Sequence, residues 1–222
     1  MAHPQLLRTL RWASIGLLAA WLTGCATAPA SKDYSAYRAA NPKSILVLPP
    51  LNDSPDVQAT ASVLSHTTRP LAEAGYYVIP VTLMSETFRQ NGLEVASDIH
   101  AVAPQKLKEI FGADTALYIK VVDYGVSYKI LSSEAVVTAQ ARLIDLRSGT
   151  ELWQGQARAS SEEGKSNSGG LAAMLITALV NQVLNSVTDA SHPVAGIATQ
   201  RLLAAGHSQG LLYGPRSPLY GK

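Results

Sequence analysis

The residues Gly206–Gly210 spell GHSQG, which has the G-x-S-x-G spacing of a serine-hydrolase nucleophile elbow. With a histidine as base and an acid beside it, Ser208 could attack an ester. An α/β-hydrolase elbow needs a strand before the serine, a helix after it, and then the acid and the histidine in chain order. Here a helical pattern precedes Ser208, residues 209–222 contain no Asp, Glu or His, and nothing places His100 or His192 beside it. The pattern favours a helix end followed by a loop, and a serine hydrolase is the less favoured alternative.

A second short match, Gly164-Lys165-Ser166, corresponds to the end of a phosphate-binding P-loop. The motif also requires a glycine five residues before Gly164, and that position is Ala159. A hairpin strand, not a buried parallel strand, is expected ahead of it. The sequence therefore predicts a flexible connection here and no phosphate site.

The histidines and acidic residues do not form a recognisable metal or acid–base set. No H-x-x-H or H-E-x-x-H spacing occurs among His3, His66, His100, His192 and His207. The acids Asp53, Asp56 and Asp98 stand where helix-capping residues are expected. We therefore expect no catalytic residues, no metal and no cofactor, and the sequence predicts a protein that is not an enzyme.

The N-terminal sequence is typical of an exported protein. Arg8 and Arg11 precede a short apolar run that is too short to span a bilayer, as in a cleavable signal over residues 1–24. The run ends in LTGC, which resembles the lipobox of bacterial lipoproteins. In those proteins the chain is cut before the cysteine, here between Gly24 and Cys25, and the cysteine carries S-diacylglycerol and an N-acyl chain. Cys25 is the only cysteine, so its acylation would leave no free thiol in an oxidising compartment.

Such an anchor predicts where the protein resides. Three acyl chains exceed the two signals that suffice for stable membrane attachment. In enteric lipoproteins an Asp after the cysteine retains the protein at the inner membrane, so by resemblance Ala26 favours the outer membrane. We expect a periplasm-facing outer-membrane lipoprotein with no cofactor beyond its covalent acyl groups.

The charge balance argues against nucleic acid as a partner. The full chain has 18 Lys and Arg against 16 Asp and Glu, and removal of residues 1–24 takes away Arg8 and Arg11 but no acid. The remaining chain is formally neutral, whereas nucleic-acid binding demands a basic surface.

The elements expected along the chain indicate one α/β domain. Residues 25–43, rich in Ala, Ser and Pro, predict a flexible tether, and residues 44–207 predict the domain. Strands are expected over 44–50, 76–81, 113–130, 135–146 and 150–160, and helices over 56–74, 83–90, 104–112, 171–187 and 194–205. Strands separated by helices pair in parallel and hairpin strands antiparallel. We therefore expect a single domain with a mixed sheet of about five strands flanked by helices.

The segment Leu171–Val187 predicts a helix with an unusually wide apolar face. Leu171, Leu175, Leu179 and Val183 lie along one side, and the apolar arc is wider than one sheet face would cover. The helix is either packed in the core beneath a tail or second helix, or it contacts another subunit or the membrane surface. Contact with another copy of the chain would make the protein a homo-oligomer.

The C-terminal tail, residues 208–222, ends in LLYGPRSPLYGK and has more Leu and Tyr than a disordered segment normally carries. Tyr213 and Tyr220 stand in the repeated Leu-Tyr-Gly triplet, and two prolines exclude regular helix. The tail either packs along its own domain or lies on a partner as an extended peptide.

Several motifs in a fixed order resemble a family of Gram-negative lipoproteins named after a neisserial genome-derived antigen. They are the lipobox, SILVLPP followed by Asn-Asp-Ser-Pro, ADTALYIKV, LRSGTELWQG and the closing LLYGPRSPLYGK. The resemblance covers nearly the whole chain. It implies the fold of the amino-terminal domain of TolB, shared with CsgG, PelC and LpoB. It also implies an association with a CsgG-like lipoprotein and a small companion lipoprotein, and no catalytic residues.

The first hypothesis is a non-enzymatic outer-membrane module that assembles with CsgG-like lipoproteins in envelope transport or surface biogenesis. Its residues are Cys25 for the anchor, the 171–187 helix for assembly, and Tyr213 and Tyr220 for docking. The second hypothesis is an LpoB-like regulator of a peptidoglycan synthase. That role needs a long reach, whereas residues 26–43 extend to about 60 Å at most.

Overall fold

The computed structural model describes residues 32–129, 132–163 and 189–222 of the chain. The signal sequence with Gly24 and Cys25 lies outside these residues, and so does the Gly164-Lys165-Ser166 match. The predicted helix bearing Leu171, Leu175, Leu179 and Val183 also lies outside them. Among the residues that the structure does describe, no helix is long and apolar enough to cross a membrane.

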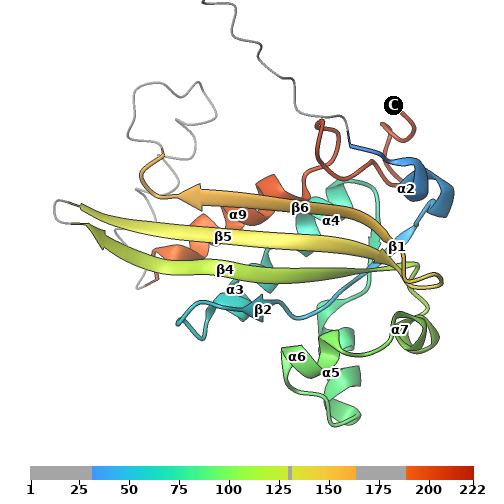
Figure 1. Cartoon of the computed structure of the whole chain (residues 1–222), viewed down its shortest axis with the longest axis horizontal. Helices are drawn as coiled ribbons and strands as arrows, with labels where there is room; N and C mark the ends of the chain where they lie inside the picture. Colours follow the sequence, from blue (N-terminus) through green and yellow to red (C-terminus); the bar gives the residue numbers. More distant parts are fainter. Residues whose placement is uncertain (1–31, 130–131, 164–188) are drawn as a thin grey trace, which may run out of the picture. The chain divides into compact units, whose positions relative to one another are not determined.

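Within the described residues, the domain contains a six-stranded mixed sheet in the order β3-β1-β4-β5-β6, with β2 also paired to β4 (Figure 1). The strands are β1 (Ser44–Val47), β2 (Leu51–Asn52), β3 (Tyr77–Val78), β4 (Thr115–Lys129), β5 (Ser132–Asp145) and β6 (Glu151–Ser160). Strands β1, β2, β3 and β4 pair in parallel, and β4, β5 and β6 pair antiparallel. The predicted mixed sheet is confirmed, and the extra strand is the two-residue β2.

Two hydrophobic clusters lie on opposite faces of the sheet. The alternation of strand side chains sends Ile45 and Val47 of β1 into one cluster, and Leu46 and Leu48 into the other. This two-sided burial explains the continuous aliphatic run of SILVLPP, and the strand predicted over 44–50 is confirmed as β1. The covering helices are α2 (Ser35–Ala40), α3 (Ala59–Ser65), α4 (Thr68–Glu73), α5 (Val81–Gln90), α6 (Ala96–His100), α7 (Pro104–Phe111) and α9 (Ser191–Leu203).

The two faces are covered to different extents. Helices α3, α4 and α9 pack on the first face, where α9 contacts β4, β5 and β6. Helices α5, α6 and α7 contribute Met84, Phe88, Ile99 and Leu107 to the second cluster and gather at one end of the sheet (Figure 1). Beyond that end, the second face of β4, β5 and β6 carries exposed polar side chains.

The single helix predicted over 56–74 is wrong, because the chain forms two helices that separate at His66 and Thr67. Pro70 explains the break. A proline has no N–H to donate to the carbonyl four residues earlier, here that of His66, and its ring clashes with that carbonyl. Thr67 instead donates its hydroxyl to the Leu64 carbonyl at 2.8 Å.

The tether and the tail are both partly folded onto the domain. Within the predicted tether 25–43, the residues of α2 are helical and Tyr37 is buried. In the tail 208–222, the Gly214 and Arg216 amides donate to the carbonyls of Ala74 and Gly75. Of the two alternatives for the tail, the structure shows packing along its own domain.

Candidate functional site

The structure does not assemble a catalytic triad around Ser208. This serine is exposed in a turn that follows helix α9, so the strand that an elbow requires before the nucleophile is replaced by a helix. The two histidines considered as partners are engaged elsewhere. His100 Nε2 lies 2.9 Å from the Pro49 carbonyl, and His192 Nδ1 lies 2.8 Å from Ser62 Oγ. The expected helix end and loop at Gly206 are confirmed.

A small polar cluster joins α3 to the start of α9. The rings of His66 and His192 stack with centroids 4.6 Å apart, and Ser62, which accompanies them, is almost fully buried. Burial lowers the pKa of His66, and the neighbouring His192 lowers it further. The His66 Nε2 atom is buried without a hydrogen-bond partner among the described residues. The cluster joins two helices, and among the described residues no group of three His, Cys, Asp or Glu could hold a metal ion.

The structure brings the predicted docking residues Tyr213 and Tyr220 together in one groove of about 330 Å³. We call it the tyrosine groove; its other lining residues are Tyr37, Arg38, Asn41, Pro42, Tyr76, Leu212, Gly221 and Lys222. The Tyr220 hydroxyl donates to Asn41 Oδ1 at 2.7 Å, which connects the tail to the end of α2. Tyr220 is 48% exposed, so part of its ring is available to another molecule.

Deeper in the tyrosine groove, the hydroxyls are already paired. The hydroxyl oxygens of Tyr37 and Tyr76 lie 2.8 Å apart, and Tyr76 donates to the Leu212 carbonyl at 2.7 Å. Burial raises the pKa of Tyr76 to about 12, and the pKa of Tyr37 lies well above its usual range for the same reason. Both phenols therefore stay neutral and act as structural hydrogen-bond donors.

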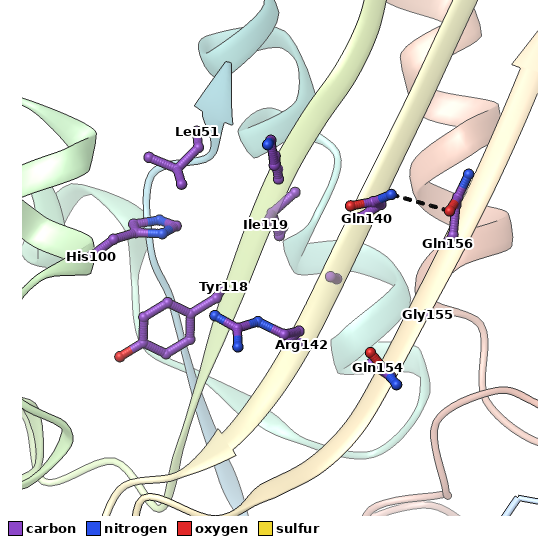
Figure 2. A pocket seen from close by; sticks show the side chains of 11 residues that line it. Leu51, His100, Tyr118, Ile119, Gln140, Arg142, Gln154, Gly155 and Gln156 are labelled. Atoms are coloured by element: carbon purple, nitrogen blue, oxygen red, sulfur yellow. Dashed lines mark hydrogen bonds between the residues drawn. The ribbon is translucent and has the colours of Figure 1, made fainter. Parts of the chain in front are cut away.

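A second hollow, of about 440 Å³, lies on the open face of the sheet (Figure 2). We call it the polar cleft; His100 lines one edge, and its polar side chains on the strands are Tyr118, Lys120, Gln140, Arg142, Gln154 and Gln156. The pairing register places them in two rows across the strands, Tyr118–Arg142–Gln154 and Lys120–Gln140–Gln156. Because successive side chains on a strand alternate between faces, all six point to the same side of the sheet.

Contacts within the polar cleft hold its side chains in place. Gln140 Nε2 donates to Gln156 Oε1 at 3.2 Å, as the dashed line in Figure 2 shows. The rings of His100 and Tyr118 meet edge to face with centroids 5.1 Å apart, and the Arg142 guanidinium lies 6.0 Å from the Tyr118 ring centroid. Burial lowers the pKa of His100, so the imidazole at this edge is neutral at neutral pH.

The sequence pointed to Tyr213 and Tyr220, which the structure places in the tyrosine groove, but it gave no prediction of the polar cleft. The missed signal was a period of two in three consecutive strands: Y-I-K in β4, Q-A-R in β5 and Q-G-Q in β6. In each triplet two long polar side chains flank a small or apolar residue. That pattern predicts a sheet with one solvent-exposed face, but only the register of strand pairing shows that the six polar residues lie side by side.

The fold and these two hollows define a mixed-sheet α/β domain with two surface hollows, the tyrosine groove and the polar cleft. The family described as "Putative lipoprotein GNA1162-like" matches residues 32–216, so the chain belongs to the GNA1162-like lipoprotein family. The family resemblance expected from the motifs is thereby confirmed.

A relative in Neisseria meningitidis serogroup B, "Putative lipoprotein NMB1124/NMB1162", is 52% identical over 185 residues, which cover 83% of this chain and 85% of the relative. The crystal structure of lipoprotein GNA1162 from Neisseria meningitidis is 56% identical, with a TM-score of 0.54. The match covers 65% of this chain and all of that one. A PelC dodecamer from Paraburkholderia phytofirmans is 18% identical, with a TM-score of 0.38 over 69% of this chain and 90% of that one. A likeness this weak says nothing about the function of this chain.

Proposed function

We propose that the protein is a lipid-anchored outer-membrane lipoprotein whose domain is a non-enzymatic assembly module. It faces the periplasm and works with CsgG-like lipoproteins and a small companion lipoprotein in envelope transport or surface biogenesis. The observation that carries the proposal is membership of a lipoprotein family over residues 32–216, with the LTGC motif ending at Cys25 just ahead of the matched region. Cys25 is the residue that bears the acyl chains.

The packing of α2 supports a position close to the membrane. Tyr34 Oη donates to the Gly210 carbonyl at 2.5 Å, and Lys32 Nζ lies over the Trp153 ring, so the chain is attached to the domain at Tyr34 at the latest. Between Cys25 and Tyr34 there are eight residues, residues 26–33, which extend to roughly 30 Å at most. The domain would therefore stay within roughly 30 Å of the leaflet that holds its anchor.

That short reach weighs against the alternative, an LpoB-like regulator of a peptidoglycan synthase. Such a regulator has to cross the mesh of the cell wall, and the sequence alone allowed about 60 Å of tether. The folding of α2 onto the domain removes about half of that length. Binding of the purified protein to a penicillin-binding protein, with stimulation of its synthase activity, would favour the alternative and count against the assembly module.

The proposed assembly surface is the tyrosine groove together with exposed large side chains that are next to its lining residues in the sequence. Tyr77, Leu219 and Tyr220 are 44%, 41% and 48% exposed. Arg216 lies over the Tyr77 ring at 5.3 Å from its centroid. Aromatic residues and arginine are the types enriched at the centres of protein interfaces.

Two experiments test the proposal. In the first, the native protein and a Cys25→Ser variant are fractionated after cell lysis; the native protein should sediment with outer membranes and the variant should not. In the second, the native protein is purified in mild detergent together with the CsgG-like lipoprotein and the small companion lipoprotein. The three proteins should form a discrete complex. A Tyr220→Ala variant should weaken that complex, while Leu83→Ala, which removes an exposed leucine on α5, should leave it intact.

Two results would overturn the proposal. One is a Cys25→Ser protein that still fractionates wholly with membranes. The other is ester cleavage by the purified protein that is lost in Ser208→Ala, which would establish the serine hydrolase instead.

A further inference from the structure

We propose that the polar cleft binds a neutral oligosaccharide. The cleft has three glutamine amides, each able to donate and to accept, arranged across β5 and β6. Sugar hydroxyl groups also donate and accept, so one glycan unit can exchange several hydrogen bonds with such a set. The cavity of about 440 Å³ lies within the usual range for small-molecule sites.

The charges that border the cleft are neutralised within the protein. Lys120 Nζ lies 2.7 Å from Asp53 Oδ2, and Arg142 Nη1 lies 3.7 Å from Glu151 Oε2. Each cation thus has its own carboxylate, so the cleft offers no net positive charge to an anionic ligand. This pairing favours a ligand that is polar but uncharged.

Tyr118 supplies the aromatic surface that sugar rings need. Its ring is half-buried and is positioned by the edge-to-face contact with His100 and the cation–π contact with Arg142. The carbon-bound hydrogens of a sugar ring carry a weak positive polarisation, which matches the negative face of an aromatic ring. A ring that is already fixed loses little conformational entropy when a ligand stacks on it.

Other occupants fit the cleft less well. The centre of an interface with a second copy of the chain would be apolar and depleted of lysine, whereas here Leu51 is the one large apolar side chain at the border that is not buried in the core. An extended peptide binds most readily by adding a strand to a sheet edge. The cleft reaches the edge strand β6 through Gln154 and Gln156, but its other four polar strand side chains lie on the inner strands β4 and β5.

The test uses the full-length protein in mild detergent and chitotetraose, a neutral tetrasaccharide with acetamido groups, as the probe. Binding is followed by calorimetry and by saturation-transfer NMR, with cellotetraose, an anionic oligosaccharide and an unrelated octapeptide as comparison ligands. We expect a dissociation constant between micromolar and millimolar for a neutral tetrasaccharide. The double variant Gln140→Ala/Gln156→Ala should bind about tenfold more weakly, which corresponds to about 1.4 kcal/mol, the net contribution of one or two hydrogen bonds.

Tyr118→Ala should also weaken binding, while Gln200→Ala, an exposed glutamine on α9, serves as the matched control. Circular dichroism checks that each variant remains folded. Absence of binding by either neutral tetrasaccharide at about 10 mM would overturn the proposal. So would equal binding by the double variant, or preferential binding of the anionic oligosaccharide or the peptide. These measurements do not involve formation of the lipoprotein complex. The oligosaccharide proposal can therefore be overturned without affecting the proposed assembly function, and the assembly function can be overturned without affecting the oligosaccharide proposal.

Discussion

The hydroxyl groups of Tyr37 and Tyr76 are joined by a hydrogen bond of 2.8 Å in the interior of the domain. Tyr76 donates its own proton to the Leu212 carbonyl, so Tyr37 is the donor between the two phenols. One residue comes from α2, one precedes β3, and the carbonyl belongs to the tail. Three segments that are distant in the sequence are thereby fixed to one another at the point where the predicted lipid tether leaves the domain.

Removal of the Tyr37 hydroxyl tests this connection. Tyr37→Phe keeps the buried ring and should lower the free energy of unfolding by about 0.5–1.5 kcal/mol, since one hydrogen bond is lost. Tyr37→Ala also empties a core position and should cost about 3–5 kcal/mol. Both values are measured by denaturant unfolding of the full-length protein in detergent. Equal costs for the two variants would contradict the packing of this ring.

Gly75 should tolerate no side chain, because the tail passes directly over it. Its φ is +95°, and a β-carbon would lie 2.4 Å from the Ser217 amide nitrogen. Gly75→Ala should therefore displace the tail and loosen its backbone, so that trypsin cuts after the exposed Arg216 more quickly. Gly92→Ala is the matched control: its φ is +74° with open space around it, so it should cost only about 1–2 kcal/mol of backbone strain. Tail cleavage that is equally slow in both variants would show that Ser217 does not lie on Gly75.

The pair His66 and His192 should make the domain less stable in acid. The folded-state pKa of His66 is lowered by burial and by His192, so below pH 6.5 the unfolded chain binds more protons at this residue than the folded one. Stability is therefore full above about pH 6.5 and falls as the pH drops toward the folded pKa. In melting curves between pH 7.5 and 5, His66→Phe should show a smaller loss than the native protein. His100 is present in both proteins, so its contribution to the pH dependence of the melting temperature is common to the two curves. A His66→Phe variant with the same pH dependence as the native protein would contradict the prediction.

Asp145 should anchor the turn between β5 and β6. Its Oδ1 accepts from the amides of Arg147 and Ser148 and from the Ser148 hydroxyl, and the residue is 4% exposed. Asp145→Ala should lower the free energy of unfolding by about 1–3 kcal/mol, because these donors lose their partner. Ser148→Ala removes a single contact of this set to Asp145 and should cost less. Denaturant unfolding measures the loss of stability in each variant. A larger loss in Ser148→Ala than in Asp145→Ala would refute this account of the turn.

Local sequence signals identified several elements well. Pro104 and Gly112 were expected to bound a helix, and α7 begins at that proline and ends before a left-handed glycine with φ of +66°. Proline in the first turn and glycine beyond the last are governed by backbone sterics within a few residues. The same kind of local rule, applied to Pro70, would have predicted the break between α3 and α4.

Contacts between residues that are distant in the sequence could not be predicted from such local patterns. The composition of residues 25–43 predicted a flexible tether, yet α2 packs against the domain because Tyr37 finds a buried partner in Tyr76. Its six residues are too short to be stable as an isolated helix, so the helix depends on that contact. No pattern within residues 25–43 contains this information.

By itself, the sequence determined the lipobox-like motif, the family resemblance, the α/β class and the period of two in the residue pattern of β4, β5 and β6. All of these depend on neighbouring residues and on short periods. Only the tertiary structure decided that Tyr213 and Tyr220 share one groove with α2, and that six polar side chains from three strands form one cleft. The physical reason is that register and long-range packing place residues by the free energy of the whole core, which no short segment encodes.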